Sequence, residues 1–261
     1  MAPRTIAITH VPSPQLEKGE RTYIETTPIS YARAVEQHAR YREVLRECGA
    51  EVILLDANRD LPDAVFVEDT AIVLDEVAVI TPMGVGSRRA EPPAIEAALR
   101  AYRPIKRVML PATLEGGDVT RVGRTLLVGR SSRTNDEGID ALRSITEPYG
   151  YETFGVRLRD CLHLKTACTA LPYDRLLINP AWLHVEDLRG LPTIDVPIEE
   201  PWAADILSIG RTVCMGAAFP RTAALVETLG FSVQRIDLSE FAKAEGGVTC
   251  LSLIFQASTS T

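Results

Sequence analysis

The stretch GGVTCLSLIF, residues 246–255, gives the first indication of both the fold and the chemistry of this chain. Its two glycines permit a sharp turn and a close approach of the backbone to another group. Cys250 follows them and opens an apolar run that predicts a strand. A cysteine after such a hinge is a candidate thiolate nucleophile, and the alternative is an inert buried cysteine at the start of a strand.

A second apolar run, LHLK at residues 162–165, predicts a strand that carries His163. Nucleophile and base must meet in space, so their separation in sequence does not count against a Cys250–His163 pair. Among the other histidines, His38 lies on the inner face of a predicted helix and His184 in a loop, while His10 remains undecided.

Composition limits the class of protein. The 261 residues are 46% hydrophobic and 24% charged, typical of a globular protein, and the net charge of -7 argues against nucleic-acid or anionic-membrane partners. No apolar run reaches the roughly 20 residues that span a bilayer, and we recognise no signal-peptide core at the N-terminus. Five irregularly spaced cysteines favour reduced thiols and a cytoplasmic location, and their spacing with His163 fits no tetrahedral zinc site.

Strands and helices are predicted to alternate along the whole chain. Predicted strands cover residues 6–8, 52–55, 71–74, 77–80, 108–110, 125–128, 167–171, 175–178, 194–196, 206–209 and 213–215. Predicted helices begin at the cap Ser30, near 92, after a Thr134–Glu137 capping box, near 221 and near 239. Strands come in twos and threes between single helices, at intervals of roughly 50 residues. This rhythm favours repeated units around a common centre, in one domain spanning residues 1–261, over a doubly wound sheet.

Charged residues in turns and loops suggest a pocket for a zwitterion with an additional cationic group. Asp63 and Asp69 flank a strand-like run with an even spacing, which would place both carboxylates on one side of an extended chain. Arg88 and Arg133 lie in loops and suit a bidentate grip on a carboxylate. When each of these residues is considered alone, the simpler interpretation is a solvated surface arginine or an ordinary acidic turn. Residues 10–28 form a long loop of the kind that is usually functional or mobile.

Together these motifs resemble the dimethylarginine dimethylaminohydrolase (dimethylargininase) family over essentially the whole chain. The matching motifs are LPDAVFVED at 61–69, SRR at 87–89, EGGD at 115–118, RTN at 133–135, LHLK at 162–165 and GVTC at 247–250. The resemblance implies the pentein fold, a five-bladed pseudosymmetric α/β propeller of ββαβ-like units. It also implies hydrolysis of Nω-methylated L-arginine to L-citrulline and (di)methylamine through a covalent thiouronium on cysteine.

The resemblance further implies a role for each matching residue. Cys250 would be the nucleophile, His163 the general acid and base, and Glu115 the group that orients the histidine. The implied substrate-binding residues are Asp69 and the carbonyl of Ala244 for the guanidinium, Asp63 and a carbonyl near Glu20 for the ammonium, and Arg88 and Arg133 for the carboxylate. Glu68 is also an implied substrate-binding residue, with no particular group of the substrate assigned to it. The long first loop would act as a lid. No cofactor or metal is expected, and a homodimer is left open.

Lys165 distinguishes the subclass within the resemblance. Related arginine deiminases have an aspartate at this position, and a lysine cannot clamp a cationic guanidinium. Thr81-Pro82-Met83-Gly84 and Asp205 depart from the usual family pattern, which has Thr-Arg-Pro-Gly and an asparagine there. The accepted guanidino substituent therefore stays open. Alternatives are an arginine deiminase, another guanidino-compound hydrolase or amidinotransferase of this fold, and a silent arginine-binding protein.

Overall fold

The computed structural model describes residues 4–257, which form five three-stranded sheets. The first three residues and the last four of the predicted domain lie outside the described part. The strands are β1 (Arg4–His10), β2 (Ala50–Leu55), β3 (Ala71–Val73), β4 (Ala78–Ile80), β5 (Ile105–Arg107), β6 (Val119–Val122), β7 (Thr125–Arg130), β8 (Glu152–Arg157), β9 (Cys168–Leu171), β10 (Arg175–Ile178), β11 (Thr193–Asp195), β12 (Ile206–Ile209), β13 (Thr212–Gly216), β14 (Ser232–Ile236) and β15 (Leu253–Ala257).

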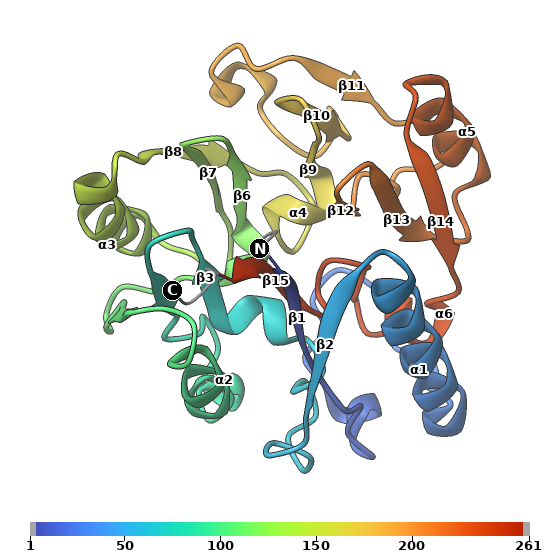
Figure 1. Ribbon diagram of the computed structural model, residues 1–261, viewed down its shortest axis with the longest axis horizontal. Helices are drawn as coiled ribbons and strands as arrows, with labels where there is room; N and C mark the ends of the chain where they lie inside the picture. Colours follow the sequence, from blue (N-terminus) through green and yellow to red (C-terminus); the bar gives the residue numbers. More distant parts are fainter. Residues whose placement is uncertain (1–3, 258–261) are drawn as a thin grey trace.

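Each sheet repeats one pattern, in which the middle strand pairs antiparallel with one neighbour and parallel with the other. The sheets are β3-β4-β5, β6-β7-β8, β11-β10-β9, β12-β13-β14 and β15-β1-β2. Sequence-consecutive strands form each antiparallel pair except one, because β1 pairs with β15 from the other end of the chain. A parallel pair needs a long connection between its strands. The C-terminal strand thus completes the sheet begun at the N-terminus (Figure 1).

The longer helices lie at the periphery of the five sheets (Figure 1). The α-helices are α1 (Tyr31–Glu47), α2 (Pro92–Leu99), α3 (Asp136–Thr146), α4 (Leu164–Ala167), α5 (Pro220–Thr228) and α6 (Ser239–Ala242). Four of them, α1, α2, α3 and α5, connect the parallel strands of a sheet, and a 3-10 turn at Val185–Leu188 lies in the equivalent connection of the remaining sheet. The expected rhythm of ββαβ units around a common centre is confirmed.

The inner strands surround a central channel. A cavity of about 490 Å³ is lined by residues of β3, β6, β9, β12 and β15, the strands nearest the middle of the molecule. Glu68 of the 3-10 helix Val67–Thr70, Lys165 of α4 and Thr249 also line this cavity. Among residues 4–257, none of the helices has both the length and the apolarity that crossing a bilayer would require.

Helix α1 shows how local sequence sets an element. The Ser30 hydroxyl accepts a hydrogen bond from the backbone N–H of Arg33 at 3.4 Å, and the chain leaves the helix at Gly49 with φ +89°. Both ends match the predicted cap and stop. The buried stripe includes Ala34, Tyr41 and Leu45, which confirms the predicted inner face.

Several local predictions are wrong. The strand predicted at 108–110 lies at Ile105–Arg107 instead, where it pairs in parallel with β4. The cap of α3 is Asn135, whose side chain accepts from the N–H of Gly138 at 2.8 Å, and the Thr134 hydroxyl instead accepts from Glu115 N–H at 3.1 Å. A tertiary contact therefore takes the hydroxyl that the capping-box pattern would have used locally.

Two further corrections concern the site. The run between Asp63 and Asp69 is not extended but forms turns and a 3-10 helix at Val67–Thr70. His163 lies at the N-cap of α4 rather than in a strand, because the next N–H, that of Leu164, donates to the Asp118 carboxylate at 3.0 Å. Both Asp63 and Asp69 line the cleft, but not because of their even spacing, since the chain between them is not an extended strand.

Candidate active site

Loops from distant parts of the chain meet at one small cleft. Its lining residues are Glu20, Asp63, Phe66, Asp69, Arg88, Arg133, Leu162, His163, Ala244, Glu245, Gly246 and Cys250. Eight of the ten predicted site residues are among them. Glu115 lies directly behind His163, and Glu68 faces the central channel. The free volume of the cleft is only about 20 Å³, so the cleft is closed in this conformation.

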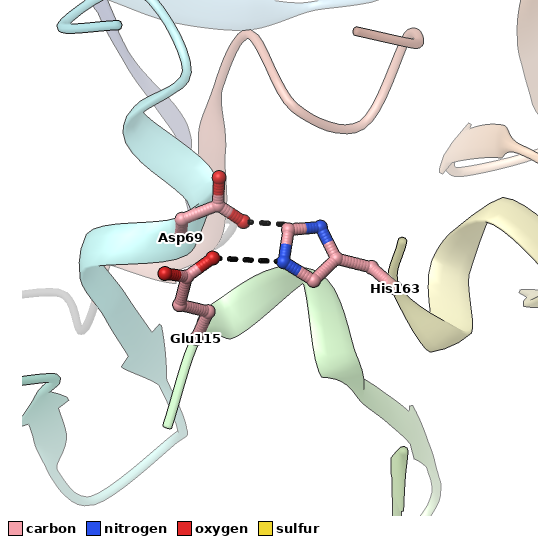
Figure 2. Close-up of side chains that lie close together, drawn as sticks. All are labelled: Asp69, Glu115 and His163. Atoms are coloured by element: carbon pink, nitrogen blue, oxygen red, sulfur yellow. Dashed lines mark hydrogen bonds and ion pairs between the residues drawn. The ribbon is translucent and has the colours of Figure 1, made fainter. Parts of the chain in front are cut away.

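His163 is bracketed by two carboxylates (Figure 2). Its Nε2 lies 2.8 Å from Glu115 Oε2 and its Nδ1 lies 3.7 Å from Asp69 Oδ1. Glycine is required at position 117, because a Cβ there would lie 2.6 Å from His163 Nδ1 and 2.7 Å from Asp69 Oδ1. The EGGD motif therefore supplies both the partner of the imidazole and the space for the imidazole.

Electrostatics favour a protonated imidazole. Burial by itself lowers the pKa of His163, but the carboxylates of Asp69, Asp118 and Glu115 outweigh it and raise the pKa to about 9. Burial likewise acts to raise the pKa of Glu115, yet the hydrogen bond from His163 leaves the pKa of Glu115 below its ordinary value. At neutral pH the pair is thus an imidazolium held by a carboxylate.

Glu115 is rigidly held. The side chain is completely buried, and its Oε1 accepts from the Gly84 N–H at 2.9 Å while Arg133 Nη1 lies 3.5 Å away. Its second oxygen receives His163, so both carboxylate oxygens have partners. A buried carboxylate with fixed donors is well suited to hold an imidazole in one orientation.

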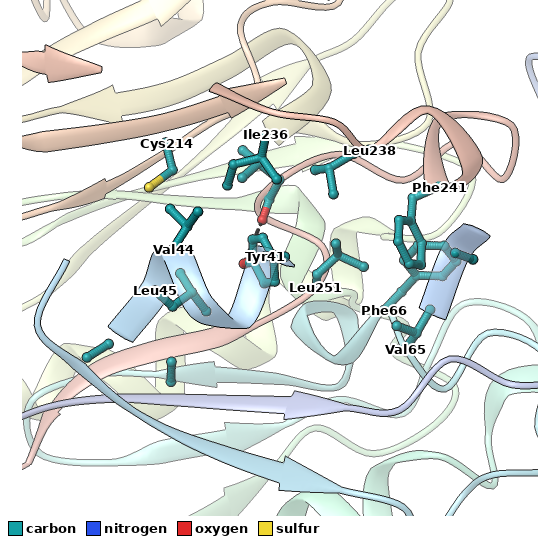
Figure 3. Packing of buried hydrophobic residues seen from close by; sticks show 14 of the residues in the cluster. Tyr41, Val44, Leu45, Val65, Phe66, Cys214, Ile236, Leu238, Phe241 and Leu251 are labelled. Atoms are coloured by element: carbon teal, nitrogen blue, oxygen red, sulfur yellow. Dashed lines mark hydrogen bonds between the residues drawn. The ribbon is translucent and has the colours of Figure 1, made fainter. Parts of the chain in front are cut away.

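The turn before β15 presents Cys250. Its Sγ receives the Gly247 N–H at 3.3 Å, and its carbonyl accepts from the Glu68 N–H at 3.2 Å. Behind the turn, the Tyr41 hydroxyl of α1 donates to the Val248 carbonyl at 2.9 Å and lies 2.7 Å from Ser252 Oγ. Figure 3 shows Tyr41 packed within the apolar cluster that includes Leu251. Core packing therefore fixes the position of the candidate nucleophile.

The thiol itself is protonated in this conformation. Burial is the largest cause, and the nearby carboxylates of Asp205, Glu68 and Asp69 add to it, so the pKa of Cys250 is raised well above its ordinary value. The Gly247 N–H acts in the opposite direction but does not compensate. A cation placed beside these carboxylates would favour the thiolate.

Asp69 and Arg88 form a buried ion pair in the cleft. Arg88 Nη1 lies 2.6 Å from Asp69 Oδ2, and the guanidinium also donates to Glu91 Oε2 at 2.8 Å and to the Phe66 carbonyl at 3.0 Å. The other oxygen of Asp69 receives the Gly117 N–H at 3.1 Å. Most donors of Arg88 are therefore already used, whereas within residues 4–257 the guanidinium of Arg133 makes only the long contact with Glu115 described above.

The first loop closes over Asp63. The Glu20 N–H donates to Asp63 Oδ2 at 3.1 Å, and the Glu20 carboxylate accepts from Ser87 Oγ at 2.5 Å. Farther along the loop, the N–H groups of Thr22 and Tyr23 donate to the Glu245 carboxylate at 2.6 and 2.5 Å. These contacts connect the first loop to the segment that carries Ala244.

Glu68 and Lys165 lie between the cleft and the central channel. Lys165 Nζ is 2.5 Å from Glu68 Oε1, while Glu68 Oε2 is buried without a hydrogen-bond partner among residues 4–257. Burial raises the pKa of Glu68 although Lys165 opposes this effect. Lys165 therefore neutralises a buried acid.

Asp69, Glu115 and His163 bring one ligand atom each within 4.8 Å of one another, a spacing that a metal ion could accept. Their atoms already have protein partners, however, in Arg88, the Gly117 and Gly84 N–H groups and the imidazole itself. The arrangement is better suited to proton transfer within the protein than to metal binding.

Three supporting residues were not predicted. Asp118 accepts from Leu164 N–H and from Ser131 Oγ at 2.6 Å and so anchors the segment of His163. Tyr41 was predicted only as a core residue, and Asp205 only as a departure from the family pattern. The sequence contains a signal for Asp118, which belongs to EGGD, but none that places Tyr41 or Asp205 behind Cys250.

Comparison with known proteins supports the resemblance. A family profile described as N,N dimethylarginine dimethylhydrolase, eukaryotic, matches residues 17–168. A dimethylarginine dimethylaminohydrolase of Streptomyces coelicolor is 39% identical over 253 residues, which cover 96% of this chain and 97% of the relative. The chain belongs to the dimethylarginine dimethylaminohydrolase family.

Members of this family from Pseudomonas aeruginosa extend the agreement to structure. The curated enzyme is 37% identical over 227 residues, 86% of this chain and 89% of the relative. A solved structure from that organism, a cysteine-to-serine mutant complexed with citrulline, matches with a TM-score of 0.90 and 35% identity, covering 96% of this chain and 98% of the other. The predicted five-bladed α/β propeller is thereby confirmed.

Proposed function

We propose that this chain hydrolyses Nω-methylated L-arginine to L-citrulline and dimethylamine or methylamine. The observation that carries the proposal is the single closed cleft in which Cys250 and His163, 87 residues apart in sequence, line the same space as Asp63 and Asp69. Membership of the family and the citrulline complex of a relative support the same reaction. We further infer a cytoplasmic enzyme from the cysteine pattern.

In the first half-reaction, the Cys250 thiolate attacks the guanidinium carbon and forms a sulfur–carbon bond. The His163 imidazolium donates its proton to the alkylated nitrogen, the carbon–nitrogen bond breaks, and the amine leaves. The product on the enzyme is a covalent thiouronium. An imidazolium whose pKa is raised to about 9 is available as the acid at neutral pH.

In the second half-reaction, neutral His163 takes a proton from water, and the resulting hydroxide equivalent attacks the thiouronium carbon. The sulfur–carbon bond then breaks, which restores Cys250 and releases citrulline. Glu115 keeps the imidazole in one orientation through both steps, since its carboxylate is 2.8 Å from Nε2 and cannot rotate away from its own donors.

The cleft also supports binding of the substrate's charged ends. We infer that Asp69 faces the guanidinium, with the Ala244 carbonyl nearby, and that Asp63 and the Glu20 backbone face the ammonium. Arg133 has more free donors than Arg88, so we assign it the larger share in binding the α-carboxylate. Glu68, already bonded to Lys165, would act on the guanidinium through its field.

Substrate charge also offers a way to ionise the nucleophile. Burial and three carboxylates keep the thiol neutral, and a bound guanidinium beside Asp69 would offset part of the repulsion from these carboxylates. The thiolate would then form chiefly when substrate is present, and its proton would leave to solvent.

We propose that the first loop acts as a lid. A volume of about 20 Å³ holds about one water molecule and no arginine. The contacts of Glu20, Thr22 and Tyr23 with Asp63 and Glu245 must therefore open for substrate to enter.

The test compares citrulline formation from asymmetric dimethylarginine and from arginine, with Cys250→Ser as the inactive variant. We expect faster turnover of the methylated substrate and a loss in Cys250→Ser on the order of 1000-fold or more, with ligand binding retained by calorimetry. Cys48→Ser, which changes a half-buried thiol outside the cleft, is the matched control and should keep activity.

Faster turnover of arginine would instead identify a deiminase. If neither the wild type nor any variant turned over either substrate, the chain would be a binding protein. Binding of dimethylarginine to Cys250→Ser should also change hydrogen exchange at residues 20–24. Unchanged exchange there would contradict the lid.

A further inference from the structure

Asp205 lies behind the turn that carries the nucleophile. It immediately precedes β12, and its Oδ1 accepts the Thr249 N–H at 3.2 Å. Its Oδ2 lies so close to Gly247 that a Cβ on that glycine would be 1.5 Å away. Gly247 in turn donates its N–H to Cys250 Sγ at 3.3 Å. The Asp205 carboxylate thus contacts the turn at two places. One is Gly247, whose N–H donates to the sulfur, and the other is Thr249, immediately before Cys250.

Ionisable groups surround Asp205 on several sides. Glu68, Asp69 and Cys250 face the same region across the turn, and Lys165 reaches it from α4 but is already bonded to Glu68. On its other side Asp205 borders a cavity of about 390 Å³ with Asp237 and Glu245 in its lining. Burial first, then Glu68, raises the pKa of Asp205 to about 7, although Lys165 and the Thr249 N–H oppose the rise.

We propose that Asp205 is a positioning residue of the hydrolase, which holds the Gly247–Cys250 turn and places a carboxylate behind the turn that carries the Cys250 sulfur. This inference builds on the proposed function. Two separable properties of the carboxylate carry it: an oxygen that accepts the Thr249 N–H, and a charge that disfavours a neighbouring thiolate.

Two substitutions separate these properties. Asp205→Asn keeps an oxygen for the Thr249 N–H and removes the charge, whereas Asp205→Ala removes both. Asp237→Asn is the matched control, because Asp237 borders the same cavity but bonds to Ser239 N–H and Arg33.

The first readout is the rate of Cys250 alkylation by the neutral reagent iodoacetamide against pH, without substrate, followed by peptide mass spectrometry. For Asp205→Asn we expect the midpoint to fall by about one pH unit, and so about tenfold faster alkylation below both midpoints. Asp237→Asn should coincide with the wild type. An unshifted Asp205→Asn profile, or an equal shift in Asp237→Asn, would overturn the role of the charge.

The second readout is steady-state kinetics. Asp205→Ala should lower kcat by about tenfold with KM changed less than about twofold, because Asp205 orients the nucleophile without touching substrate. Wild-type kcat in Asp205→Ala would overturn the positioning role. The alkylation experiment does not require turnover, so its result tests the role of Asp205 even if the proposed substrate is wrong.

If neither Asp205 variant folds, the wild-type protein still gives an answer. Carboxyl carbon-13 titration of aspartate-labelled protein should show one carboxyl with a midpoint near pH 7, above the one near pH 6 expected for Asp118. Across that higher midpoint, the rate of Cys250 alkylation in the wild type should rise less than tenfold per pH unit, because ionised Asp205 disfavours the thiolate. Absence of that carboxyl, or a tenfold rise per pH unit throughout, would contradict the coupling.

Discussion

At the scale of single residues, the site places opposite demands on His163 and Cys250. Both lie beside buried acids, and Asp69 is common to the two groups of acids. The carboxylates stabilise a cation on the imidazole and destabilise an anion on the sulfur, so the resting pair is imidazolium and thiol. This differs from a cysteine–histidine ion pair, and the difference follows from the acids of the cleft. A cationic substrate, as proposed above, is expected to change this balance toward the thiolate.

Glu115→Gln tests the partner of His163. We expect kcat to fall on the order of 100-fold, and the high-pH limb of the kcat profile to move from about 9 to lower pH, because one of the carboxylates that raise the pKa of His163 becomes neutral. Exposed Glu147→Gln should match the wild type. An unmoved limb would show that Glu115 does not set the protonation of His163.

The same shift affects stability against pH. Folding raises the pKa of His163 from 6.5 to about 9, so its contribution to the free energy of unfolding is complete below about pH 6.5 and is lost as the pH rises through 9. The free energy of unfolding, measured by urea titration at several pH values, should decrease less between pH 6.5 and 9 in Glu115→Gln than in the wild type.

At the scale of elements, the nucleophile depends on helix α1. Tyr41 of that helix is fully buried in the apolar cluster (Figure 3). Its hydroxyl donates to the carbonyl of Val248, two residues before Cys250. The turn has no regular secondary structure of its own, so side-chain hydrogen bonds take the place of a backbone ladder. Rigid packing in the core is thereby transmitted to the reactive sulfur.

Tyr41→Phe should lower the free energy of unfolding by about 1–3 kcal/mol, since the substitution leaves the buried Val248 carbonyl and Ser252 hydroxyl without this partner. Denaturant unfolding measures the loss, and kcat should fall with it because the turn is less well held. Tyr31→Phe on the exposed side of the same helix is the control. Equal stability of the two variants would contradict the anchoring role.

At the scale of the whole molecule, the ring of sheets closes between the two ends of the chain. β15 pairs with β1 over five registered residue pairs, from Arg4 with Ala257 to Ile8 with Leu253. Phe255 of β15 is buried and packs edge-on against Tyr102 at 5.3 Å between ring centroids. We propose that this closure makes the chain one cooperative domain.

Phe255→Ala should therefore destabilise the entire molecule by about 3–5 kcal/mol. Trp182 and Trp202 pack together in another part of the ring, with 4.6 Å between their ring centroids. We expect the unfolding midpoint from their fluorescence to equal the midpoint from circular dichroism of the backbone. Exposed Ile198→Ala should change little. Separate midpoints for the two probes would indicate more than one folding unit.

Local patterns in the sequence were sufficient for α1, for the glycine stops, and for most strands, because caps and apolar periodicity depend on neighbouring residues. The family resemblance identified eight residues that line the cleft, six of which lie in its motifs and two, Glu20 and Ala244, outside them. It did not reveal that His163 begins a short helix, that Arg88 is already bound by Asp69 and Glu91, or that Glu68 faces the channel.

The sequence by itself determined the rhythm of strands in twos and threes between single helices and the types of residue available for chemistry, since both follow from short-range pattern and composition. Only the tertiary structure decided that Cys250 is held by Tyr41 and Asp205, and that its thiol is protonated beside a charged imidazole. Those properties arise from groups more than 40 residues apart, whose mutual distances and loss of solvent exist only after the ring has closed.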